Sequence, residues 1–272
     1  MAMEDRFIDA GGIRTHYFDE GRGPALLLLH GGGAGTDAWA NWRGAIPRLA
    51  TEFRVLAIDM LGFGRTDKPD PAKFIYSQEA RTGHVAAFIE ALGLGKVNLI
   101  GNALGGFTAL SLAIARPELI EKLVLMGSAA LRTERNEALH PVETYTPSRE
   151  NMERLMTSMV SPGFRIDPEL IDYRLKLTLD PEIMAANRAT VKWIAEQGGL
   201  FIRNEDEIAR VRHKTLILAG RNDRIQPPQN HWRLWHLIEN SWLHLVADCG
   251  HWVMIERPDE FCALIRWFVR DA

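Results

Sequence analysis

The chain has little cysteine and no long apolar run. Its 272 residues include two cysteines, Cys249 and Cys262, which we expect to be reduced and packed inside the protein, with a single bridge between them as the alternative. The longest apolar stretches, such as "ALLLL" and "KLVLMGSAAL", fall far short of the roughly 20 residues that span a bilayer. The acidic start "MAMEDRFIDA" does not have the pattern of a signal peptide. We therefore expect a soluble, cytoplasmic protein without a membrane partner.

A strong charge imbalance is also missing. The 32 Lys and Arg residues nearly balance 35 Asp and Glu residues, and the net charge of -3 gives no electrostatic reason to expect nucleic acid as a partner. The nine histidines form no His-Glu-x-x-His cluster and the cysteines no Cys-x-x-Cys pair, so no metal site is expected. The glycine-rich stretch at 31–35 lacks the spacing of a nucleotide-binding loop.

Several short apolar runs predict strands buried in a parallel sheet. Each run is followed by a glycine-bearing turn and a helical stretch, which is typical of an α/β fold. The segment "RFIDAGGIRTHYF" alternates around Gly11 and Gly12 and predicts an antiparallel hairpin at the edge of the sheet. The predicted buried strands are residues 26–29, 55–58, 97–100, 123–126, 216–218 and 243–246.

This rhythm of strands stops over residues 132–206, where helix-forming segments separated by Pro and Gly take over. We therefore predict a core made of residues 1–131 and 207–272, with a helical cap of residues 132–206 inserted between the sixth and seventh strands. Within the cap an apolar stripe repeats at helical spacing and either packs on the core or lines a pocket. The stripe consists of Met152, Leu155, Met156 and Met159.

The stretch "LIGNALGGFTAL" joins a predicted buried strand to a predicted helix. Small residues at Gly101 and Gly105 let the strand and the helix approach closely, which forces residue 103 into a strained corner with its side chain pointing into a site. This is the context of the nucleophile elbow of serine hydrolases, but Ala103 occupies the position of the nucleophile. An ordinary tight turn between a strand and a helix is the alternative.

Further motifs supply the other parts of such a site. The loop after residue His30 matches the one that provides an oxyanion-hole amide, which nominates the backbone N–H groups of Gly32 and Leu104. Asp223 and His251 follow two later strands, in the order expected for an acid and a base after the nucleophile. We expect His251 to be the general base and Asp223 to fix its tautomer.

Five stretches together resemble the meta-cleavage product hydrolases of the α/β-hydrolase superfamily. They are "HGGGAGTDAWANWRG", "DMLGFGRTDKP", "GNALGG", "VKWIAEQGGLF" and "CGHWVMIERPDEF", with Asn102 and Trp252 as the more specific matches. The resemblance implies the α/β-hydrolase fold, a mostly parallel sheet with helices on both faces. It also implies cleavage of 2-hydroxy-6-oxohexa-2,4-dienoates, without a cofactor, to 2-hydroxypenta-2,4-dienoate and a carboxylic acid. Family members commonly form dimers or larger assemblies, so we expect a homo-oligomer.

The resemblance also implies which residues bind the substrate. "EQGGLF" is similar to relatives from carbazole, dibenzofuran or biphenyl degradation, which implies an aryl group on C6 of the substrate. The cap arginine is placed at Arg174, with Arg188 as the alternative. The residues expected at the substrate are Gly31, Gly33, Asn41, Asn102, Arg174 and Trp252.

Ala103 leaves more than one interpretation open. We interpret the chain as a carbon-carbon bond hydrolase whose nucleophile has been replaced by engineering, because Asp223, His251 and the oxyanion loop all remain. A natural relative that has lost catalysis and become a noncatalytic small-molecule binder is one alternative. A carboxylesterase or lactonase is another, and it would have no need of Asn102 together with Arg174.

Overall fold

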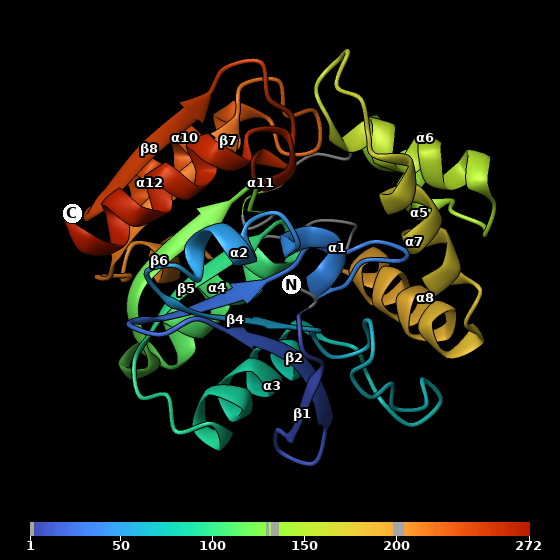
Figure 1. Ribbon diagram of the computed structural model, residues 1–272, viewed down its shortest axis with the longest axis horizontal. Helices are drawn as coiled ribbons and strands as arrows, with labels where there is room; N and C mark the ends of the chain where they lie inside the picture. The colour runs from blue at the N-terminus through green and yellow to red at the C-terminus, as the bar shows by residue number, and fades with distance from the viewer. Residues whose placement is uncertain (1–2, 129–130, 132–135, 198–203) are drawn as a thin grey trace.

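The computed structural model describes residues 3–128, 131, 136–197 and 204–272, and it is built around one eight-stranded sheet (Figure 1). The strands are β1 (Arg6–Asp9), β2 (Arg14–Glu20), β3 (Ala25–Leu29), β4 (Arg54–Ile58), β5 (Val97–Asn102), β6 (Ile120–Met126), β7 (Lys214–Gly220) and β8 (Ser241–Val246). Their order across the sheet is β1-β2-β4-β3-β5-β6-β7-β8.

The sheet is mostly parallel, as predicted. β1 and β2 form the expected antiparallel hairpin at one edge, and β2 is also antiparallel to β4, whereas every pair from β4 to β8 is parallel. The central strands are buried on both faces, which explains why β3 reads as the unbroken apolar run "ALLLL".

Helices cover both faces of the sheet, again as predicted. Successive side chains of a strand point to opposite faces, so Leu26 and Leu28 belong to one core cluster and Leu27 and Leu29 to the other. The first cluster is covered by α1 (Ala38–Trp42), α2 (Ile46–Leu49), α11 (Val253–Glu256) and α12 (Pro258–Arg270). The second is covered by α3 (Gln78–Ala91), α4 (Leu104–Ala115), α9 (Glu205–Ile208) and α10 (Pro228–Leu237).

The described chain between β6 and β7 contributes helices and no strand to the sheet. Aspartates cap α7 and α8 and a serine caps α6, with a proline opening α7 and α8, so polar residues and prolines set where these helices begin. The helices lie together beside the sheet in Figure 1. They are α5 (His140–Glu143), α6 (Arg149–Met159), α7 (Pro168–Thr178) and α8 (Pro181–Glu196). The boundaries of core and cap at residues 131/132 and 206/207 stay predictions.

The apolar stripe of α6 faces inward. Met152, Leu155, Met156 and Met159 are all buried, and all four join the same core cluster as α1 and α12. Met159 also borders the cavity described below, so this one side chain serves both of the expected purposes.

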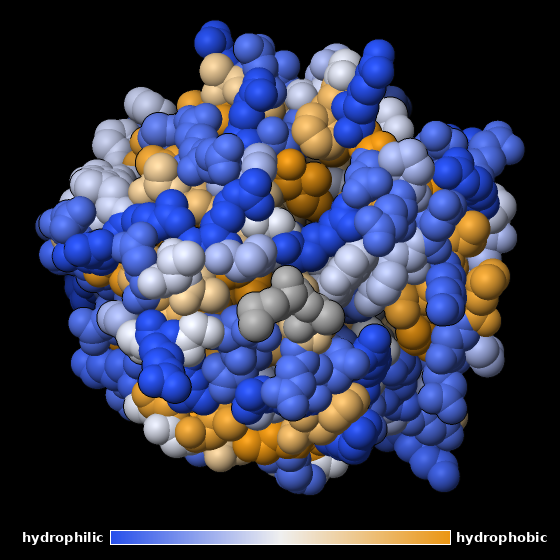
Figure 2. All heavy atoms as spheres, in the orientation of Figure 1, coloured by the Kyte–Doolittle hydropathy of each residue, from blue (hydrophilic) through white to orange (hydrophobic). Residues whose placement is uncertain are grey.

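The outer surface is mainly polar. In Figure 2 hydrophilic residues dominate the visible face, and apolar residues gather in separate groups. Across the described ranges, no helix combines the length and the apolar character that crossing a membrane requires.

We expect Gly105→Ala to destabilise the fold. A Cβ at residue 105 would lie 2.3 Å from the carbonyl oxygen of Leu29 and 2.5 Å from that of His30, and these backbone atoms belong to or directly follow β3. The free energy of unfolding, measured by urea denaturation, should fall by about 2 kcal/mol or more because the helix must move away from the sheet.

Gly83→Ala is the matched control. Gly83 also lies in a helix, but a Cβ there would meet no atom within 4 Å. Its replacement should raise the free energy of unfolding by up to about 1 kcal/mol, since alanine favours a helix more than glycine does. Equal effects of the two substitutions would contradict the close packing of α4 on β3.

Candidate active site

The turn between β5 and α4 holds its central residue in an unusual conformation. Ala103 has φ 50° and ψ -110°, a region that residues with a Cβ rarely adopt, and its N–H donates to the carbonyl of Met126 at 2.9 Å. A Cβ at Gly101 would lie 2.3 Å from the carbonyl oxygen of Gly105, so the two glycines are required by the close approach of strand and helix. The corner predicted from the sequence is therefore present.

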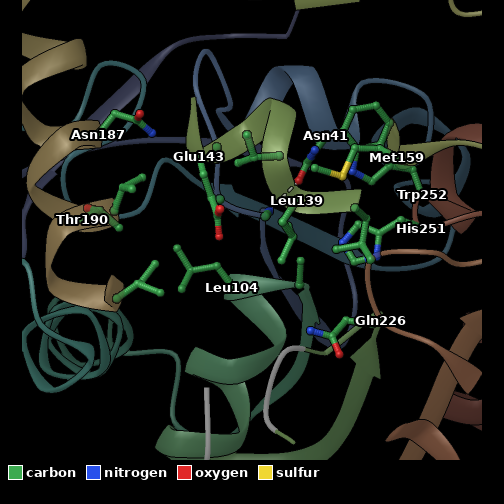
Figure 3. Close-up of a pocket in the computed structure, with 18 of the residues that line it drawn as sticks. Asn41, Leu104, Leu139, Glu143, Met159, Asn187, Thr190, Gln226, His251 and Trp252 are labelled. Carbon is green, nitrogen blue, oxygen red and sulfur yellow. Dashed lines mark hydrogen bonds between the residues drawn. The ribbon is translucent and has the colours of Figure 1, made fainter. Parts of the chain in front are cut away.

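A cavity of about 530 Å³ opens in front of this corner (Figure 3). Its wall combines Ala103, Leu104 and His251 from the core with residues of α5 and α8, and most of the lining is apolar. A cavity of this size and character suits a small organic molecule.

Asp223 and His251 meet at the edge of the cavity. The Nδ1 atom of His251 lies 2.8 Å from Oδ2 of Asp223, and both side chains are buried. The other oxygen of Asp223 accepts hydrogen bonds from the N–H groups of Ile225 and Gln226 at 2.8 and 2.9 Å. The carboxylate is thus fixed on both sides, and it fixes the orientation of the imidazole.

The glycine-rich loop after β3 lies against the corner. A Cβ at Gly32 would touch the Leu104 side chain at 3.2 Å, so these residues are neighbours. Within the described ranges, no acceptor is bonded to the N–H of Gly32 or of Leu104. His30 shapes the loop, because its Nδ1 bonds to the Gly31 carbonyl at 2.7 Å and its Nε2 accepts from the Met60 N–H at 2.9 Å. Burial lowers the pKa of His30, which keeps the ring neutral.

Four of the six residues expected at the substrate border the cavity. These are Gly31, Gly33, Asn41 and Trp252. The side chain of Asn41 accepts the Gly31 N–H at 2.7 Å, so it braces the loop as well as facing the cavity. Trp252 is buried and directly follows His251.

Asn102 and Arg174 lie behind the glycine loop and do not border the cavity. The Nδ2 of Asn102 donates to the Met126 carbonyl at 3.3 Å, and its Oδ1 has no hydrogen-bond partner in the described part of the chain. The Arg174 guanidinium donates to the Ala34 carbonyl and the Thr36 hydroxyl at 2.7 and 2.8 Å. Burial lowers the pKa of Arg174 to about 10, which leaves it cationic at neutral pH.

The alternative arginine and the missed residues can also be placed. Arg188 is exposed and borders a separate surface groove between α8 and residues 71–76. The sequence prediction did not include Glu143, Asn187 or Gln226, although all three border the cavity. Only their position on the folded cap and strand-end loops brings them there.

The helix that carries Arg174 is tied to the core by a buried acid. The hydroxyl of Tyr173 donates to Asp37, whose other oxygen accepts the N–H of Ala40 at 2.7 Å. The rings of Tyr173 and Trp39 lie 4.2 Å apart between centroids. Burial first, and the neighbouring Asp59 carboxylate second, raise the pKa of Asp37 to about 7.

Comparison with known proteins places the chain in a family. The alpha/beta hydrolase fold profile matches residues 24–170 and 173–258. A 2-hydroxy-6-oxo-6-(2'-aminophenyl)hexa-2,4-dienoic acid hydrolase of Metapseudomonas resinovorans is 42% identical, over 96% of this chain and 89% of the relative. A structure of a meta-cleavage product hydrolase from Pseudomonas fluorescens IP01, a serine-to-alanine mutant complexed with acetates, is 34% identical with a TM-score of 0.91, over 98% of this chain and 97% of that chain. The chain belongs to the meta-cleavage product hydrolases of the α/β-hydrolase family. A further relative of this meta-cleavage product hydrolase is a serine hydrolase involved in carbazole degradation, which is 40% identical with a TM-score of 0.91, over 98% of this chain and 99% of that chain.

We expect Asp37 to make the stability of this meta-cleavage product hydrolase depend on pH. The unfolded chain loses the proton of this carboxyl near pH 3.9, whereas the folded chain keeps it to about pH 7. The free energy of unfolding therefore falls as the pH rises through this interval and levels off above it. Asp37→Asn removes this contribution. The free energy of unfolding of the variant, relative to that of the unsubstituted chain, should therefore rise by a few kcal/mol between about pH 4 and pH 8.

Urea denaturation at several pH values measures this difference. The control is Asp259→Asn, since the side chain of Asp259 is 90% exposed and should show no such trend over the same range. Parallel pH profiles for the Asp37 variant and its parent would show that the carboxyl ionises alike in the folded and unfolded chains.

Proposed function

We propose that this chain contains the active site of a carbon-carbon bond hydrolase for 2-hydroxy-6-oxohexa-2,4-dienoates, with alanine at the position of the nucleophile. The observation that supports this most is the buried pair of Asp223 and His251, bonded at 2.8 Å, in which His251 borders the same cavity as Ala103. A protein that only binds a ligand has no need of a carboxylate that fixes the orientation of an imidazole at the wall of its cavity.

In the parent enzyme a serine hydroxyl would stand at the corner that Ala103 now occupies. The Nδ1 of His251 is committed to Asp223, so Nε2 is the nitrogen that would accept the serine proton. The oxygen, or a water activated by it, would attack the C6 ketone of the substrate. The N–H groups of Gly32 and Leu104 would stabilise the oxyanion that forms.

The second half of the reaction breaks the bond between C5 and C6. The dienol must first take its keto form, so that the electron pair of this bond is delocalised toward the ketonised tail when the bond breaks. C5 gains a proton and C6 gains the oxygen of water, which gives 2-hydroxypenta-2,4-dienoate and a carboxylic acid. This chemistry requires a site that stabilises an anionic tail as well as the oxyanion.

We place the dienoate tail beside the glycine loop. Asn41 and Trp252 face the cavity there, and the buried Arg174 cation lies directly behind Gly33, 3.8 Å from where a Cβ at that glycine would be. The Nε of Arg174 and the Oδ1 of Asn102 have no hydrogen-bond partner in the described ranges, and these groups support a role in holding an anion and an enol. An ester substrate would make no use of these two unpaired atoms.

Ala103 is, in this proposal, the replacement of a catalytic serine by engineering. The retained acid, base and oxyanion loop support it, as does the description of one relative as a serine hydrolase. The present chain then binds its substrate without cleaving it efficiently. The aryl group on C6 was inferred from residues 196–201, of which residues 198–201 lie outside the described residues. The aryl group, the homo-oligomer and the cytoplasmic location stay predictions.

Ala103→Ser should restore cleavage of the dienoate. A serine at this corner would share the cavity with His251. The rate of hydrolysis should therefore rise by about 10³-fold or more over that of the present chain with Ala103. The loss of the yellow absorbance of 2-hydroxy-6-oxo-6-phenylhexa-2,4-dienoate measures the rate, and chromatography identifies benzoate and 2-hydroxypenta-2,4-dienoate.

The double variant Ala103→Ser with His251→Ala is the control and should return to background. A serine variant that consumes only nitrophenyl esters would instead indicate an esterase. A serine variant without activity on either class, although folded, would indicate a binding protein.

A further inference from the structure

Asn187 is a buried polar side chain that the proposed mechanism does not use. It lies on α8, only 8% exposed, and it borders the cavity. In Figure 3 its amide group extends from α8 toward the cavity, on the side opposite to His251 and Trp252. Within the described ranges its side chain has no hydrogen-bond partner, which is unusual because buried amides are normally paired.

The unpaired amide is not explained by the packing of the helix. Threonines buried in other helices bond to their own backbone: the hydroxyls of Thr82, Thr108 and Thr178 donate to carbonyls three or four residues earlier, at 2.7 to 2.9 Å. Asn187 makes no such bond, and its amide is directed into open space. A group that is desolvated by the fold and then left facing a cavity is suited to a polar partner inside that cavity.

The neighbours of Asn187 limit what that partner is. Val191 and Ile194 continue the same face of α8 as an apolar wall that suits a ring. Glu143 of α5 also borders the cavity, and in Figure 3 its carboxylate points into the space between α8 and Leu104. The amide oxygen of Asn187 accepts hydrogen bonds, so a ring that carries a hydrogen-bond donor suits this part of the cavity.

The direction of the substrate follows from the proposed function, on which this inference rests. Asn41, Trp252 and Arg174 place the anionic dienoate beside the glycine loop, with C6 at the corner of Ala103. The remaining part of the cavity, toward α8, is then left for the group attached to C6. We propose that Asn187 binds a neutral hydrogen-bond donor, an amino or hydroxyl group, on an aryl substituent at C6. Asn187 is therefore a specificity-determining residue rather than a catalytic one.

Binding to the present chain tests this directly, because Ala103 prevents efficient turnover. Calorimetric titration with 6-aminophenyl and 6-methylphenyl dienoates compares two rings of nearly equal size that differ in the donor. The present chain should bind the aminophenyl compound about tenfold more tightly than the methylphenyl compound. Asn187→Leu should abolish the preference. The affinity for the aminophenyl compound should fall about tenfold, while the affinity for the methylphenyl compound should change by about twofold or less.

Thr190→Val is the matched control one turn along α8. Thr190 also borders the cavity, but its hydroxyl oxygen is inaccessible, so the removal of this oxygen should leave the preference unchanged. Thermal unfolding shows whether each variant is folded, and Asn187→Ala replaces the leucine variant if that one is not. If a folded Asn187 variant keeps the ratio of the two affinities, the assignment of Asn187 is wrong and the proposed function is unaffected. If the present chain binds none of these dienoates, the proposed function is wrong as well.

Discussion

The close approach of β5 and α4 is the constraint on which the site depends. Gly101 and Gly105 leave no room for a side chain between strand and helix, and the chain can turn in this space only by holding Ala103 at φ 50°. That conformation directs the residue's side chain and places the N–H of Leu104 at the start of α4, where the helix has no internal acceptor for it. One backbone contact thus positions both the side chain of Ala103 and the N–H of Leu104, the two groups that the proposed function assigns to the nucleophile and the oxyanion hole.

The sheet then brings distant segments to this corner. β5, β7 and β8 are parallel, so the loops that follow them lie at the same end, and the bonded pair of Asp223 and His251 reaches the cavity that Ala103 lines although these residues are far apart in sequence. The N–H groups of Ile225 and Gln226 donate to one oxygen of Asp223 and so fix the carboxylate that bonds to His251. Polar groups that are fixed in this way need no rearrangement when charge develops during a reaction.

The fold and the core half of the site could be predicted from local sequence. Unbroken apolar runs identified the strands, and the glycine spacing at 101 and 105 identified the corner, because both reflect contacts between segments adjacent in the chain. The cap half could not be predicted. Asn187 and Glu143 reach the cavity only through the packing of α5 and α8, and helical periodicity alone does not say which side of a cap helix faces a ligand. Arg174 was predicted at the substrate, whereas the structure places it behind Gly33, in a position that depends on how α7 docks.

The contacts of α7 with the core have a consequence for how the cap is held. Tyr173 and Arg174 bond to the loop that also supplies Gly32, and Arg43 of the core pairs with Asp167 at the start of the same helix. Lifting this side of the cap would expose the buried Arg174 cation and break the bonds to the glycine-rich loop at the same time. These contacts hold the α7 side of the cap to the core, so the position of the Arg174 cation and the shape of the glycine loop are set together.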